Sequence, residues 1–356
     1  MATGGFPKMT ASLMRAGRGD LAHRFRPGGD TLVVVFSQVR VPAGKFGLER
    51  LFAGTTHSLL LLNQSMNNWY RSRGADIDRL IDEAVVAVKA ERVILYGSSM
   101  GAFGAAAAAS RRLDADLYAF APDFRIGEPG SQSAAAGLPL QSDEADLGHL
   151  LALPRRGPAR VIVPLYDPYD AGVGARLAAL SLPDEVTLVP LCSSHEVHDH
   201  LYSLNVIRKV TATFRRDIGV EAAARGLLVR SVDWSAHARF AAARAAFDAG
   251  APLDPDAVMG LLPEINPGLA LLAAEAAERA GDIGRAEALL AGLDAAIADD
   301  AILSGLVKRY LKEVPRRRIR LLRDAGDIAA SHRIAAEAAT RFPTDKGFAA
   351  FVDGSG

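Results

Sequence analysis

Residues 97–101, GSSMG, follow the apolar segment 93–96 and run directly into an alanine-rich stretch. Their pattern is G-x-S-x-G, in which a sharp strand-to-helix turn presents the hydroxyl of the central serine, here Ser99. Glycines two residues before and two after the serine avoid collisions in such a tight turn. The free N–H groups at the start of the following helix favour a developing oxyanion. The pattern therefore predicts that Ser99 is a nucleophile.

Two other interpretations of this turn stay open on the turn alone. A dinucleotide-binding turn has the spacing G-x-G-x-x-G, whereas Gly97, Gly101 and Gly104 have the spacing G-x-x-x-G-x-x-G. An ordinary strand-to-helix turn with a surface serine fits the five residues equally well. Candidate catalytic residues elsewhere in the chain distinguish between these interpretations.

A serine hydroxyl needs a histidine to take its proton and an acid to orient that histidine. Residues 160–170, RVIVPLYDPYD, place Asp167 directly after an apolar segment, and Asp170 three residues later. An aspartate before proline at a strand end is also a common turn residue. We predict Asp167 as the orienting acid and keep Asp170 as the alternative.

Histidines follow the last apolar segment, in residues 186–201, VTLVPLCSSHEVHDHL. His195 is the first of them, and His198 and His200 fall within the helix expected to start there. We predict His195 as the general base and keep His198 as the alternative. The spacing H-x-x-H-x-H without further ligands is a weak metal signal, so we expect neither a metal nor another cofactor.

Acyl transfer also needs donors for the oxyanion. The backbone N–H of Met100, the residue after the nucleophile, is the first candidate. The second is expected after the apolar segment 31–36, where Ser37 or Gln38 would donate it.

The elements that position these residues alternate along the chain. Between residue 31 and about residue 216, short β-branched segments alternate with helical ones, and each segment is apolar at nearly every position. Strands of this kind are typical of a mostly parallel sheet covered by helices on both faces. We predict an α/β fold with an N-terminal extension over 1–30, an α/β domain over 31–217 and a helical domain over 218–356. The predicted strands are TLVVVFSQV, HSLLLLNQ, RVILYGSS, DLYAFAPD, RVIVPLYD and VTLVPLCS.

The C-terminal third is rich in alanine and leucine at helical spacing. The phrase AGDI occurs at 280–283 and again at 325–328, with an amphipathic segment on each side. Glycine at these positions predicts the end of one helix and the start of the next. Such hairpins resemble tetratricopeptide repeats, although the phrases lie 45 residues apart rather than ~34. The arginine-rich run from Pro315 is interpreted as a solvated helix face.

Residues 31–216 resemble the α/β-hydrolase superfamily, through GSSMG with its trailing AFGA, YDP after one strand and SSH after the last. The segment 67–74, NNWYRSRG, is similar to uncharacterised bacterial hydrolase-like proteins. The resemblance implies a triad of Ser99, Asp167 and His195. A glycine is usual shortly before the acid, but residues 164–166 are Pro, Leu and Tyr here.

Composition narrows the classes of partner. The 41 basic and 41 acidic residues give no net charge, which provides no overall attraction to nucleic acid or an anionic membrane. The single cysteine, Cys192, rules out an internal disulfide, and no apolar run reaches the roughly 20 residues of a membrane span. We expect a cytoplasmic enzyme with a small-molecule or acyl substrate.

Three functions fit these predictions. The first is a serine hydrolase that cleaves a carboxylic ester, thioester or amide through an acyl-enzyme on Ser99. The second is an acyltransferase with the same triad, since both share the acyl-enzyme. The third is a catalytically silent hydrolase-like module that binds a protein partner through its C-terminal helices.

Overall fold

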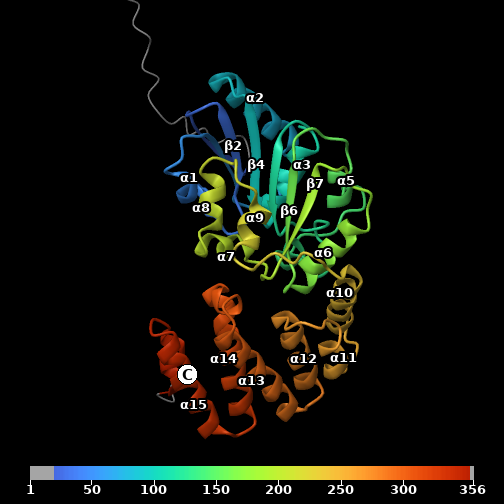
Figure 1. Cartoon of the computed structure of the whole chain (residues 1–356), viewed down its shortest axis with the longest axis vertical. Coiled ribbons are helices and arrows are strands. Elements are labelled where there is room, and N and C mark those ends of the chain that lie inside the picture. Colours follow the sequence, from blue (N-terminus) through green and yellow to red (C-terminus); the bar gives the residue numbers. More distant parts are fainter. Residues whose placement is uncertain (1–19, 353–356) are drawn as a thin grey trace, which may run out of the picture. The chain divides into compact units, whose positions relative to one another are not determined.

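The computed structural model describes residues 20–352 (Figure 1). Its strands are β1 (Leu21–Arg26), β2 (Thr31–Phe36), β3 (Ser58–Gln64), β4 (Arg92–Ser98), β5 (Asp116–Phe120), β6 (Ala159–Pro164) and β7 (Val186–Leu191). The helices between and directly after them are α1 (Glu49–Phe52), α2 (Gly74–Val88), α3 (Met100–Ala109), α4 (Gln132–Ala135), α5 (Leu147–Leu151), α6 (Pro168–Ala178), α7 (Val197–Ser203) and α8 (Val206–Thr211). The C-terminal part consists of α9 (Ile218–Ala223), α10 (Trp234–Asp248), α11 (Pro255–Met259), α12 (Pro267–Arg279), α13 (Ile283–Asp299), the short 3-10 helix η1 (Leu303–Gly305), α14 (Lys308–Asp324), α15 (Ile328–Arg341) and α16 (Lys346–Val352).

The seven strands form one sheet in the order β1-β3-β2-β4-β5-β6-β7. β2 pairs in parallel with β3 and β4, and β4 pairs in parallel with β5. The amides of Ala159 and Leu165 donate to the carbonyls of Glu185 and Leu191, an offset that is the same at both ends, so β6 and β7 are also parallel. These pairings and the flanking helices confirm the predicted α/β fold with a mostly parallel sheet.

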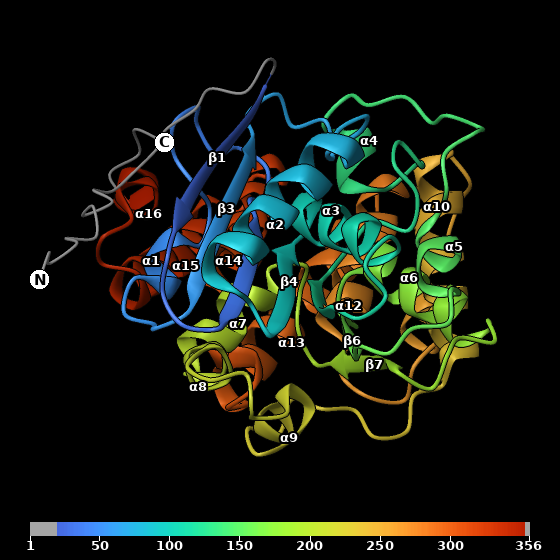
Figure 2. The same ribbon diagram turned by 90° about the horizontal axis from the view of Figure 1, so that it is seen from above.

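All six strands predicted from apolar segments are present, but β1 was not predicted. Residues 21–26, LAHRFR, fall within the stretch predicted to be an N-terminal extension. They pair antiparallel with β3 at the edge of the sheet (Figure 2). An edge strand carries charged side chains on its exposed positions, so this segment lacks the continuous apolar pattern of the inner strands.

The inner strand β2 is apolar and completely buried beyond its first residue. Every residue from Leu32 to Phe36 in β2 is buried with no exposed surface. Helices α2 and α3 pack against β2, and α3 also packs against β4 and β5. The alanines of α3 are short enough for this helix to approach the strands closely, which fixes where its first turn lies.

The residues group into two compact units. The first comprises residues up to Val161 together with Ser181–Thr187. The second comprises Ile162–Leu180 and all residues from Leu188 onward, so it contains α6, the turn after β7 and the C-terminal helices. The domain boundary predicted between residues 217 and 218 stays a prediction. None of the helices within residues 20–352 is long and apolar enough to cross a membrane.

Helices α12 to α15 pack in succession (Figure 1), each against the next. The predicted glycine turns are present: Gly281 and Gly326 have φ angles of 79° and 83°, in the left-handed region that glycine adopts readily at helix ends. Asp282 and Asp327 then cap α13 and α15 through their side chains. The helical C-terminal part is thereby confirmed, and its tetratricopeptide likeness stays a prediction.

The arginine-rich run in α14 is not a solvated face. The side chains of Arg317 and Arg318 are only 9% and 14% exposed. Arg317 pairs with Glu278 on α12, and Arg318 pairs with Glu287 on α13. These ion pairs join α14 to the two preceding helices, so this part of the arginine run holds the C-terminal helices together.

Candidate functional site

Ser99 occupies the tip of the turn between β4 and α3. Its φ and ψ angles are 53° and −120°, a region of backbone conformation that residues other than glycine rarely adopt. The strain is held in place because the Ser99 amide donates a 2.8 Å hydrogen bond to the carbonyl of Phe120 at the end of β5. The side chain is mostly buried, with 8% of the residue exposed.

The glycines around Ser99 are steric requirements. A Cβ at Gly97 would overlap the carbonyl oxygen of Gly101. A Cβ at Gly101 would overlap the carbonyl oxygen of Phe36 at the end of β2, and one at Gly104 would overlap the ring of Tyr70. Each glycine thus allows a close approach that any side chain would prevent. This finding supports the interpretation of the GSSMG pattern as a functional turn.

The first helical residue after the turn is Met100, so its amide belongs to the N–H groups at the positive end of α3. The amide of Ser37, one of the two candidates for the second oxyanion donor, donates to the carbonyl of Leu62 at 2.9 Å. The Ser37 hydroxyl accepts a hydrogen bond from the amide of Gly47. The amide and the hydroxyl of Ser37 are therefore already engaged in hydrogen bonds. Gln38 remains as the candidate for the second oxyanion donor.

The loop after β2 is anchored by a buried amide side chain. Asn63 Nδ2 donates to the carbonyls of Val41, Pro42 and Lys45 at 3.0–3.2 Å. The hydroxyl of Tyr70 donates to the carbonyl of Ser37 at 3.0 Å, and burial raises the pKa of that phenol. These bonds hold the loop that begins at Ser37. Neither anchor residue was predicted, because one asparagine in an apolar strand gives no spacing signal.

The structure pairs His195 with Asp170 instead of Asp167. His195 Nδ1 lies 2.9 Å from Asp170 Oδ2, and the side chains are 17% and 2% exposed. Asp167 caps α6: its Oδ1 accepts hydrogen bonds from the amides of Tyr169 and Asp170. This geometry favours Asp170, the alternative kept from the sequence, over Asp167: the Asp167 carboxylate caps the helix, whereas the Asp170 carboxylate lies within hydrogen-bond distance of the histidine.

The three histidines after β7 have different surroundings. His195 contacts Asp170, and His198 Nδ1 lies 3.7 Å from Asp199. His200 is fully buried, and its Nδ1 lies 2.9 Å from the hydroxyl of Ser193. Burial lowers the pKa of His200 to about 4. Within residues 20–352, no cluster of three or more His, Cys, Asp or Glu side chains that could hold a metal ion is found.

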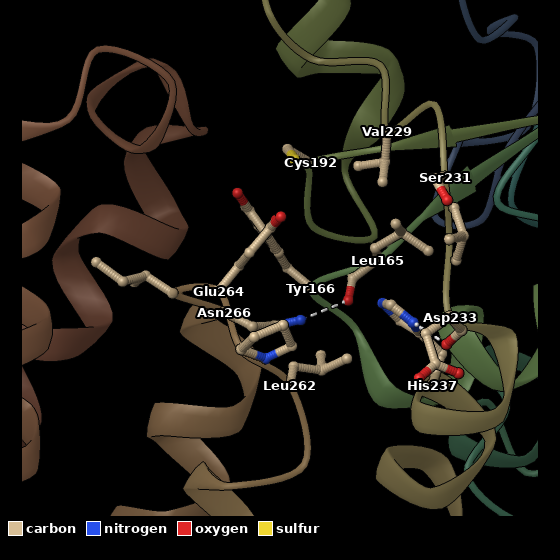
Figure 3. Close-up of a pocket in the computed structure, with 13 residues that line it drawn as sticks. Leu165, Tyr166, Cys192, Val229, Ser231, Asp233, His237, Leu262, Glu264 and Asn266 are labelled. Atoms are coloured by element: carbon tan, nitrogen blue, oxygen red, sulfur yellow. Dashed lines mark hydrogen bonds between the residues drawn. The ribbon is translucent and has the colours of Figure 1, made fainter.

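A cavity of about 120 Å³ lies in the second unit (Figure 3). Leu165 and Tyr166, directly after β6, line it together with Cys192, directly after β7. Segments before α10 and before α12 supply the other walls. The aromatic residue Tyr166 therefore lines a pocket. By contrast, the aromatic residues Trp69, Tyr70 and Phe103 are at least 95% buried in the first unit.

The sequence matches no known family profile and no curated protein. Several solved structures are similar to this chain, all at low sequence identity. An esterase from Pyrococcus furiosus has 13% identity and a TM-score of 0.42, over 56% of this chain and 87% of that one. Est1E from Butyrivibrio proteoclasticus has 12% identity and the same TM-score, over 60% and 100%.

A capsule O-acetyltransferase of Neisseria meningitidis serogroup A has 12% identity and a TM-score of 0.41, over 60% of this chain and 96% of that one. The sheet order, the parallel pairings and the turn at Ser99 give the fold directly. The chain has an α/β-hydrolase-type fold with a G-x-S-x-G turn after β4, followed by C-terminal helices.

Proposed function

We propose that the protein is a serine hydrolase that cleaves a carboxylic ester, thioester or amide through an acyl-enzyme on Ser99. The observation that carries this proposal is the backbone of Ser99, with φ and ψ of 53° and −120° between a strand and a helix. A turn with strained backbone angles lowers the stability of the fold, and such strain is typically found where it presents a reactive side chain.

The base in this proposal is His195 and the orienting acid is Asp170. A carboxylate only accepts hydrogen bonds, so the bond to Asp170 keeps the proton on His195 Nδ1 and leaves Nε2 as the nitrogen that accepts the serine proton. The turns after β4, β6 and β7 follow strands of one mostly parallel sheet. We propose that they meet at its carboxyl edge, where α/β folds bind their ligands.

The reaction then runs in two steps. Ser99 Oγ attacks the substrate carbonyl carbon as His195 takes its proton, and the amides of Met100 and Gln38 stabilise the oxyanion. The leaving group departs with the proton from His195. Water, deprotonated by His195, then attacks the acyl carbon; the bond between this carbon and Ser99 Oγ breaks, the acid leaves, and His195 returns its proton to Ser99 Oγ. No cofactor is needed for these steps, and the proposed setting is the cytoplasm.

Mass spectrometry of the intact protein tests this proposal. Brief incubation with p-nitrophenyl acetate and acid quenching should add one acetyl group, mapped to Ser99, and Ser99→Ala should gain none. Repeating the reaction with an added alcohol acceptor separates hydrolysis, which releases acetate alone, from acyl transfer, which also yields the new ester. No acylation of the wild-type protein by esters, thioesters or amides would leave the silent binding module as the better account.

A further inference from the structure

The cavity in the second unit lies beside the turns that carry Asp170 and His195. Leu165 and Tyr166 form one side of it, and Cys192 forms the adjacent side (Figure 3). Asp170 follows Tyr166 by four residues, and His195 follows Cys192 by three. The cavity therefore lies beside the turns that follow β6 and β7 and carry the proposed acid and base. The proposed mechanism does not use it.

The C-terminal helices supply the facing wall and hold it firmly. Asn266, 5% exposed at the start of α12, donates from Nδ2 to the carbonyl of Leu165 at 2.9 Å. Its Oδ1 accepts from the amide of Gly268 at 2.9 Å. A Cβ at Gly268 would overlap the carbonyl oxygen of Tyr166. The backbone before α12 therefore lies directly against the backbone after β6, and the wall it forms is fixed.

The lining is apolar with a few hydrogen-bond acceptors. Leu165, Val229 and Leu262 supply apolar surface, and the carboxylate of Glu264 stands at the same pocket (Figure 3). His237 Nδ1 lies 2.9 Å from the carbonyl of Asp233. Since a carbonyl only accepts, His237 Nδ1 carries the proton of this hydrogen bond.

The charge of the lining disfavours anions. The described residues that line the cavity include Asp233 and Glu264 but neither lysine nor arginine. The pKa of the Cys192 thiol is raised, chiefly by burial and further by the negative charges of Glu264 and Asp300. A carboxylate or phosphate would lose its hydration here without gaining a cationic partner. The cavity is thus suited to an uncharged apolar group.

We propose that this cavity is a binding site for a small uncharged apolar molecule. Its volume of about 120 Å³ is well above the ~10–15 Å³ that a single water molecule needs, so it has room for a small organic molecule. Butyramide, which is uncharged and has a short apolar chain, is a suitable probe.

Alkylation of Cys192 tests binding without any catalysis. Cys192 is the only cysteine, so intact mass reports its reaction with N-ethylmaleimide without ambiguity. Butyramide should slow this alkylation at least threefold in the wild type, and succinamate, which adds a carboxylate, should not slow it. Leu262→Trp, which fills the cavity, should remove the protection by butyramide. Ile328→Trp, an exposed position of α15 outside the lining, should retain it. Absence of protection in the wild type would overturn the proposal.

Discussion

Asp170, one helical turn into α6, contacts His195 through a 2.9 Å bond, while Asp167 at the start of the same helix binds backbone amides. The two carboxylates are three residues apart, yet one has a histidine to orient and the other has a helix end to cap. This difference separates their roles and makes them a matched pair for mutation.

Asp170→Asn should lower kcat by about 10³–10⁴-fold, because an amide no longer fixes the histidine tautomer or stabilises the imidazolium. Asp167→Asn should keep kcat within about threefold, because asparagine caps helices as well as aspartate does. Steady-state hydrolysis of p-nitrophenyl acetate measures both. A large loss in Asp167→Asn with a near-normal Asp170→Asn would restore the assignment made from the sequence.

Gly101→Ala should destabilise the protein by about 3 kcal/mol and slow acylation of Ser99, because the new methyl group meets the carbonyl of Phe36. Gly54→Ala is the matched control, since nothing lies within 4 Å of a Cβ there. Urea denaturation gives the free energy of unfolding for each variant. Equal, small changes in both would show that the turn relaxes without cost.

Asn266→Asp should lower kcat by about 10–100-fold, the scale of a misplaced catalytic group, and should also lower the melting temperature, because it places a carboxylate oxygen against the carbonyl of Leu165 at a buried site. Aspartate still caps α12, but it cannot donate to the carbonyl of Leu165, so the backbone ahead of Asp170 loses its anchor. Asp282→Asn is the control: it replaces the aspartate that caps α13 by asparagine, the reverse of the exchange at residue 266. It should leave kcat unchanged. If both variants have wild-type kcat, the start of α12 does not position the acid.

The free energy of unfolding should fall as the pH drops from about 6.5 towards 4, because the unfolded chain protonates His200 in that range while the folded protein does not. A pKa lowered to about 4 from 6.5 corresponds to at most about 3 kcal/mol. His200→Phe should flatten this part of the profile, which guanidinium titrations at several pH values can follow. A parallel profile in the variant would assign the acid sensitivity to other groups.

The turn at Ser99 could be predicted because its glycines are steric necessities that leave a fixed spacing in the sequence. The inner strands could be predicted for a similar reason: burial on both faces demands unbroken apolar segments. The edge strand β1 could not be predicted in this way, since its six residues include a histidine and two arginines and form no unbroken apolar segment.

The sequence does contain a signal that distinguishes Asp167 from Asp170. Asp167 precedes Pro168, and a capping residue followed by proline at the first helical position is a typical helix start. That signal assigns Asp167 to the cap and places Asp170 one turn later. The anchor roles of Asn63 and Asn266, by contrast, depend on contacts between distant segments, which no local pattern encodes.

Labelling with a fluorophosphonate probe tests the central claim most directly, because the probe reacts only with a serine that a base has activated. The wild type should form one adduct mapped to Ser99, His198→Ala should label at a similar rate, and His195→Ala should label at least 100-fold more slowly. Ser99→Ala should not label. Equal labelling of wild type and Ser99→Ala, or no labelling of a folded wild type, would contradict the account.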